Sequence, residues 1–136
     1  MSPPSSAPSH APLTVFLVDD DRLLLDMYSL KFKAAGSVVE SFPDPSTALD
    51  KLRQGAHPDI ILLDIVMPML TGFEFLETMR KEKLAEQTKV VMLSNQGAQE
   101  DIDKATALGA AGYIIKASSI PSEVLEKALA IAAGTA

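Results

Sequence analysis

The sequence of 136 residues contains no cysteine and only two histidines, His10 and His57. Without thiols the chain forms no disulfide, no thiolate metal site and no cysteine nucleophile. Both histidines lie near prolines in segments that we expect to be loops, so a histidine-based metal site is not expected. The chain has 12 Lys and Arg against 18 Asp and Glu, a net charge of −6, without a basic cluster. This balance argues against direct nucleic-acid binding.

Long apolar runs are also missing. None approaches the roughly 20 residues needed to span a bilayer, so we expect no membrane segment. The first residues are rich in proline and serine and have neither a basic start nor an apolar stretch, so they do not resemble a secretion signal. We predict a flexible tail over residues 1–12, one folded domain over 13–133, a short tail over 134–136, and a cytoplasmic location.

Between these tails, short apolar runs alternate with amphipathic stretches. The predicted strands cover residues 13–18, 37–42, 59–64, 88–93 and 111–115. A helical pattern follows each of them, beginning near residues 22, 45, 72, 98 and 121. Five such repeats predict an α/β fold in which a doubly wound five-stranded parallel sheet carries helices on both faces.

The most informative run covers residues 59–68, where a continuous apolar strand ends in Asp64 and the sequence Met-Pro follows soon after. A charge at the end of a buried strand is costly unless it has partners or a function. The remaining polar strand ends are Asp19, Asp20, Ser94 and Lys116. Because the carboxyl ends of parallel strands meet at one edge of a sheet, we expect these side chains to converge on one site.

The chemistry of such a site follows from its charges. Three neighbouring carboxylates repel one another, and a hard divalent cation with oxygen ligands removes that conflict. Mg²⁺ fits best because it uses few carboxylates and retains several waters. Lys116 adds a compact positive charge, and Ser94 adds a neutral hydrogen-bond donor. Together these groups are suited to stabilise a transferring phosphoryl group, and a carboxylate can itself be the nucleophile.

Four motifs, in this order, resemble the receiver domain of bacterial two-component response regulators, and in particular single-domain receivers of the chemotaxis type. They are Val-Asp19-Asp20-Asp, Leu-Leu-Asp64-Ile-Val-Met-Pro68 with Gly72, Met-Leu-Ser94, and Gly112-Tyr113-Ile-Ile-Lys116. The similarity covers about residues 13–133. It implies a flavodoxin-like sheet with the strand order 2-1-3-4-5.

The resemblance also implies a role for each residue of the site. Asp64 would accept a phosphoryl group from a phosphohistidine on a histidine kinase or a histidine phosphotransfer protein. Asp19, Asp20 and Asp64, together with the backbone carbonyl of Val66, would hold Mg²⁺. Lys116 would pair with Asp64 before phosphorylation and with a phosphoryl oxygen afterwards.

A conformational switch is implied as well. Ser94 would hydrogen-bond the phosphoryl group and draw its loop inward, which would let Tyr113 change rotamer and alter the surface of the fourth helix, fifth strand and fifth helix. The domain would then be a signalling switch that catalyses only its own phosphorylation and dephosphorylation, as a monomer or a weak phosphorylation-dependent dimer. Two departures from the family pattern are Ala117, where proline is usual, and Ser94, where threonine is commoner. At Ala117 we expect a trans peptide, since a non-proline cis bond costs ~3 kcal/mol.

The first predicted helix is apolar nearly all round. The stripe that we expect to face the sheet consists of Leu24, Met27, Tyr28, Phe32 and Ala35. Leu23 and Leu30, seven residues apart, would then lie on another face. An exposed apolar strip often marks a partner site, and in receiver domains this helix commonly docks the phosphodonor. Leu23 and Leu30 are therefore candidate docking residues, with tolerated exposure as the alternative.

Other functions fit parts of the pattern less well. An aspartyl phosphatase typically has a second aspartate two residues after the nucleophile, where this chain has Val66. A flavin-binding domain of similar topology needs a phosphate-binding loop after the first strand, where three aspartates would repel phosphate. A degenerate receiver used only for docking would not need the complete set of polar strand ends. Asp21 is expected to be only a helix N-cap. Gly72 is expected to serve the turn or the helix entry, and Tyr113 has a simpler alternative as a half-buried core aromatic.

Overall fold

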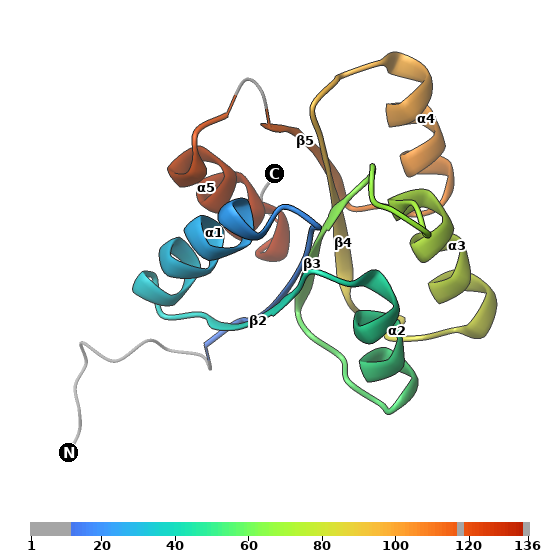
Figure 1. Ribbon diagram of the computed structural model, residues 1–136, viewed down its shortest axis with the longest axis horizontal. Helices are drawn as coiled ribbons and strands as arrows, with labels where there is room; N and C mark the ends of the chain where they lie inside the picture. Colours follow the sequence, from blue (N-terminus) through green and yellow to red (C-terminus); the bar gives the residue numbers. More distant parts are fainter. Residues whose placement is uncertain (1–11, 117–118, 135–136) are drawn as a thin grey trace.

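The computed structural model describes residues 12–116 and 119–134, and five strands alternate with five helices along them (Figure 1). The strands are β1 (Thr14–Val18), β2 (Val38–Phe42), β3 (Ile60–Asp64), β4 (Lys89–Ser94) and β5 (Gly112–Ile115). The helices are α1 (Arg22–Ala34), α2 (Pro45–Arg53), α3 (Gly72–Glu82), α4 (Gln99–Ala107) and α5 (Pro121–Ala132). Most of the predicted tails over 1–12 and 134–136, namely residues 1–11 and 135–136, and the expectation for Ala117 lie outside the described residues. Within the described part, no helix is long and apolar enough to cross a membrane.

The five strands form one parallel sheet in the order β2-β1-β3-β4-β5. This order confirms the predicted doubly wound α/β fold. The first strand, β1, lies next to the edge strand β2, and after β2 the chain crosses back past β1 to the central strand β3. The winding direction changes between β1 and β3, and open α/β sheets have a crevice outside the carboxyl ends of the strands at such a point. Ligand sites in open α/β sheets lie at such a point, and the polar strand ends are located here.

Alternate residues of the central strands pack against opposite layers of helices, as the pleat of a strand requires. Phe16 and Val18 of β1 join a core cluster with α2 and α3, whereas Val15 and Leu17 join a second cluster with α1 and α5. Figure 1 shows α1 and α5 on one side of the sheet and α2, α3 and α4 on the other. All five residues of β3 are buried, as expected for a strand that helices cover on both faces.

The buried face of α1 corrects the stripe expected from the sequence. Leu25, Tyr28 and Phe32 are buried, whereas Met27 is 37% exposed and Ala35 is exposed as well. The spacing of the three buried residues places them on one side of a helix. These residues belong to the same core cluster as residues of α5 and of the sheet. Contact with both α5 and the sheet, and not with the sheet alone, therefore determines which side of α1 is buried.

The helices begin at the edge where the strands end, and side-chain caps hold two of the loops that join them. Asp21 accepts hydrogen bonds from the N–H groups of Leu23 at 3.1 Å and Leu24 at 3.2 Å, so it is the N-cap of α1. Thr71 and Glu74 form a reciprocal capping box at the start of α3. The loop after β1, which carries Asp19 and Asp20, and the loop after β3, which directly follows Asp64, are therefore anchored at both ends.

Candidate functional site

Three aspartates converge at the carboxyl edge of the sheet, as the strand ends predicted. Asp19 directly follows β1 and is 1% exposed, Asp64 is the last residue of β3 and is 5% exposed, and Asp20 is exposed. One carboxylate oxygen from each of the three lies within 4.8 Å of the others. Two buried carboxylates and an exposed one thus share a space of the size that a single cation occupies.

Lys116, directly after β5, supplies the positive charge nearest to this cluster. Its ammonium donates to Oδ1 of Asp64 at 3.0 Å and to Oδ2 of Asp19 at 3.1 Å. The side chain of Lys116 is only 8% exposed, so both ion pairs are almost out of contact with water. The attraction between these charges is therefore stronger than in a surface ion pair. Removal of one partner would leave the other as an uncompensated buried charge.

The electrostatics of the cluster are unbalanced, because one ammonium faces three carboxylates. Burial, followed by repulsion from Asp19, raises the pKa of Asp64 from 3.8 to about 6, although Lys116 acts in the opposite direction. Burial would lower the pKa of Lys116, but attraction to Asp64 and Asp19 outweighs it, so the pKa of Lys116 is raised. The surplus negative charge and the all-oxygen donor set fit a hard divalent cation such as Mg²⁺.

Two backbone contacts hold the acidic residues in place. The N–H of Asp21 donates to Oδ1 of Asp19 at 2.9 Å, which orients the carboxylate that Lys116 also contacts. Gly72 lies against the end of β3, where a Cβ would overlap the carbonyl oxygen of Asp64 and reach 3.0 Å from the Cα of Ile65. Sequence reasoning assigned Gly72 only to the helix entry. Its close approach to the backbone of Asp64 depends on tertiary packing, and the neighbouring sequence does not indicate it.

Ser94 and Tyr113 are linked through one loop residue, Gln96. Ser94 is the last residue of β4, is 7% exposed, and its Oγ accepts a hydrogen bond from the N–H of Gln96 at 3.1 Å. The hydroxyl of the half-buried Tyr113 donates a hydrogen bond to the carbonyl oxygen of Gln96, with 2.9 Å between the two oxygens. Movement of the loop after β4 would therefore alter both contacts. The sequence indicated both residues but not the peptide that connects them.

The remaining candidate residues lie on the surface around the cluster. Val66, two residues after Asp64, has a side chain that is 77% exposed. Leu23 and Leu30 on α1 are each 70% exposed, and Met27 lies between them on the same helix. The spacing of these three residues, four and then three, places them on one helical face. We call Leu23, Met27 and Leu30 the α1 strip.

Comparison with known proteins places this arrangement in a family. The model of the response regulator receiver domain matches residues 15–129. Among solved structures, the chemotaxis protein CheY4 of Vibrio cholerae is 31% identical, with a TM-score of 0.81, over 89% of this chain and 99% of that one. A CheY-like receiver domain protein from Methanospirillum hungatei is 26% identical, with a TM-score of 0.81, over 92% of this chain and 97% of that one.

Curated relatives are longer proteins. The probable transcriptional regulatory protein TcrX of Mycobacterium tuberculosis is 31% identical over 114 residues, 84% of this chain and 47% of that protein. The phosphate regulon transcriptional regulatory protein PhoB of Escherichia coli is 28% identical over 117 residues, 86% of this chain and 50% of that protein. This chain thus spans about half the length of these relatives.

Receiver domains are signalling switches whose general function is to accept a phosphoryl group from histidine kinases or phosphotransfer proteins, with Mg²⁺ at the acidic pocket. The family match covers most of the chain, the strand order is that of the CheY-like fold, and three aspartates, a serine and a lysine lie at or next to the carboxyl ends of the strands. The chain is a receiver domain of the two-component response regulator family.

Proposed function

We propose that Asp64 accepts the phosphoryl group, from a phosphohistidine of a histidine kinase or a histidine phosphotransfer protein. The observation that carries this proposal is the position of Asp64: it is buried at the end of β3, 3.0 Å from the ammonium of Lys116, and its carboxylate faces that of Asp19. Asp19, Asp20, Asp64 and the carbonyl of Val66 would hold Mg²⁺. Bound there, Mg²⁺ would supply positive charge next to the phosphoryl oxygens.

The transfer itself needs few groups. A carboxylate oxygen of Asp64 forms the new bond to phosphorus, the bond from phosphorus to the imidazole nitrogen breaks, and its electron pair remains on the imidazole. The ammonium of Lys116 then contacts a phosphoryl oxygen in place of the carboxylate. The hydroxyl of Ser94 donates a hydrogen bond to another phosphoryl oxygen. Hydrolysis of the resulting acyl phosphate by water returns Asp64 to its starting state.

The switch follows from the contacts of Gln96. If Ser94 turns toward the phosphoryl group, the N–H of Gln96 loses its acceptor and the loop after β4 moves. The carbonyl of Gln96 then leaves the hydroxyl of Tyr113, which frees the ring to change rotamer. We propose that α4, β5 and α5 form the output surface, that the domain acts in the cytoplasm as a monomer or weak phosphorylation-dependent dimer, and that it contacts neither nucleic acid nor membrane directly.

A small phosphodonor tests the proposal without a partner protein. Incubation with acetyl phosphate and Mg²⁺ is expected to add one phosphoryl group, detected as a mass increase of the intact protein. Borohydride trapping and peptide mapping should place it on Asp64. Chelation of Mg²⁺ with EDTA is the matched control and should prevent the increase. An unchanged mass with Mg²⁺, or a phosphoryl group on another residue, would contradict the proposed role.

The α1 strip is proposed to dock the phosphodonor. Changing Leu23 and Leu30 to serine removes two exposed apolar side chains, whose burial in an interface contributes about 1.5–3 kcal/mol each. The rate of phosphotransfer from the protein donor should therefore fall at least about tenfold, while the reaction with acetyl phosphate stays unchanged. Val38→Ser is the control, since Val38 is an apolar residue that is 58% exposed on β2 and does not belong to the α1 strip. Equal rates for the double variant and wild type would refute docking at this strip.

A further inference from the structure

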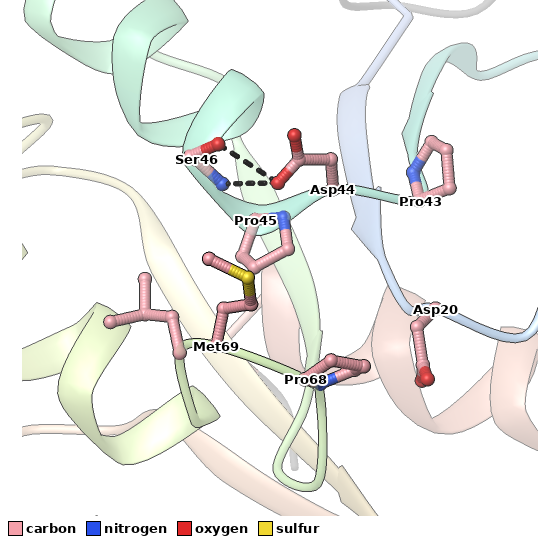
Figure 2. A pocket seen from close by; sticks show the side chains of 8 residues that line it. Asp20, Pro43, Asp44, Pro45, Ser46, Pro68 and Met69 are labelled. Carbon is pink, nitrogen blue, oxygen red and sulfur yellow. Dashed lines mark hydrogen bonds between the residues drawn. The ribbon is translucent and has the colours of Figure 1, made fainter.

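A cavity opens beside the acidic cluster, and apart from Asp20 its lining residues have no part in the phosphoryl transfer described above. Its volume is about 330 Å³, and it lies between the loop after β2 and the loop after β3 (Figure 2). Its lining residues follow the carboxyl ends of β1, β2 and β3. Asp20 belongs both to this lining and to the acidic cluster. A protein that approached Asp64 would therefore cover the cavity as well.

The walls of the cavity combine apolar surface with negative charge. Pro43, Pro45, Pro68 and Met69 provide much of the apolar wall, and Leu70 extends it. Two of the described lining residues, Asp20 and Asp44, are acidic, and none is basic. The cavity therefore favours an occupant that is itself apolar along its length and positively charged at one end.

Asp44 retains its charge and one carboxylate oxygen for such an occupant. Its Oδ1 accepts hydrogen bonds from the N–H and the hydroxyl of Ser46, at 3.0 Å and 2.9 Å, which caps α2 (Figure 2). These bonds lower the pKa of Asp44, so the group is anionic at neutral pH. The hydroxyl of Thr47 contacts Oδ2 only at 3.4 Å, which leaves this oxygen able to accept a stronger bond.

Met69 is placed in an unusual way for an apolar residue. Its side chain is 99% exposed, and its backbone has a φ of +73°, a conformation that L-amino acids rarely adopt. The N–H of Leu70 donates to the carbonyl of Pro68 at 2.8 Å and closes a tight turn around it. Backbone strain of this kind clusters at binding sites. A flexible, polarizable methionine at the mouth of a cavity suits contact with a partner side chain.

We propose that this cavity receives a single arginine or lysine side chain from the protein that phosphorylates Asp64. The methylene stem would pack on the prolines and Met69, and the charged head would reach Asp44 and Asp20. This inference rests on the proposed function, because the partner is the phosphodonor. It adds a charged anchor beside α2, which lies on the other side of the sheet from α1.

A side-chain mimic tests the proposal in the absence of an identified donor. With Mg²⁺ present, Nα-acetyl-arginine methylamide is expected to shift the amide signals of Ser46, Met69 and Leu70 saturably. The citrulline derivative has the same shape without the charge and should bind about two- to fivefold more weakly, the range of a partly exposed ion pair. Asp44→Asn, which retains a capping side chain, should reduce the arginine affinity by a similar factor. Asp50→Asn, at the other end of α2, is the charge-matched control and should not.

Three results would overturn the proposal. They are equal affinity for the arginine and citrulline derivatives, shifts confined to Asp19 and Asp64, and unchanged affinity in both Asp44→Asn and Met69→Gly. Glycine suits the positive φ at position 69, so this second variant removes the apolar wall without straining the turn. Phosphorylation by acetyl phosphate is measured on the same wild-type sample. A protein that binds the mimic but accepts no phosphoryl group would contradict only the proposed function, and the reverse result only the cavity.

Discussion

Replacement of Asp64 by asparagine is expected to abolish phosphoryl acceptance and, without divalent cations, to make the protein more stable than wild type. The first effect follows because an amide oxygen does not form an acyl phosphate. The second follows because Asp64 is buried beside Asp19, where its charged form is disfavoured. A variant that is inactive and yet more stable excludes the simple explanation that activity was lost by unfolding.

The size of the stabilisation depends on pH. Burial and Asp19 raise the pKa of Asp64 from 3.8 to about 6, so its ionisation is disfavoured in the folded state by roughly 3 kcal/mol. This penalty is absent below pH 3.8, grows between 3.8 and about 6, and is complete above that range. The Asp64→Asn variant would forgo the ion pair with Lys116 but escape the repulsion. We therefore expect a gain of about 1–3 kcal/mol at pH 8, and little or none near pH 4.

Urea unfolding in EDTA at pH 4, 6 and 8 measures this gain, and acetyl phosphate with Mg²⁺ measures the reactivity. Asp26→Asn, an exposed position on α1, is the control for removal of one negative charge. Added Mg²⁺ should stabilise wild type more than the Asp64 variant, because the cation gains one more carboxylate ligand in wild type. A variant less stable than wild type at pH 8 in EDTA would contradict the electrostatic account of the site.

Replacement of Lys116 by methionine is expected to destabilise the protein by about 3–5 kcal/mol at pH 8, because it leaves two buried carboxylates without their shared cation. The raised pKa of Lys116 means that its contribution is fully present below pH 10.5 and is lost only above that value. The cost should be smaller near pH 5, where Asp64 in the variant is protonated. Phosphorylation by acetyl phosphate should also slow, since no ammonium contacts the phosphoryl oxygens.

A double-variant cycle separates the ion pair from simple loss of packing. In the background of Asp64→Asn, the change of Lys116 to methionine should cost less than in wild type, because only Asp19 still loses a charged partner. Lys127→Met on α5 is the control, since Lys127 is exposed and its ammonium donates to the hydroxyl of Ser119. Urea unfolding gives the four free energies that the cycle needs. Equal costs in the two backgrounds would show that Lys116 acts mainly through packing.

Much of the fold was predictable because its signals are local. A strand covered on both faces must be apolar throughout, as β3 is, and helices that follow each strand leave a periodic pattern. The polar strand ends were predictable for a related reason. In a parallel sheet every strand finishes at the same edge, so residues as far apart as Asp19 and Lys116 are assigned to one place before any contact is known.

Other features depended on packing between elements. The residues of α1 were apolar nearly all round, and only contact with both α5 and the sheet selected Leu25 over Met27 for burial. The role of Gly72 against the backbone of Asp64 had no sequence signal beyond a helix entry. The cavity beside Asp20 has none either, because its walls come from three loops whose relative positions no periodicity describes.

Hydrophobic periodicity and parallel winding are enough to place strand ends, so the order of amino acids already implies that a carboxylate ends the central strand and that acidic, hydroxyl and ammonium groups share its edge. How those charges balance depends on the packed structure. Lys116 divides its ammonium between Asp64 and Asp19, and burial beside Asp19 leaves Asp64 with a pKa of about 6. Distances and desolvation set that balance, and both arise only when the five strands are packed between their helices.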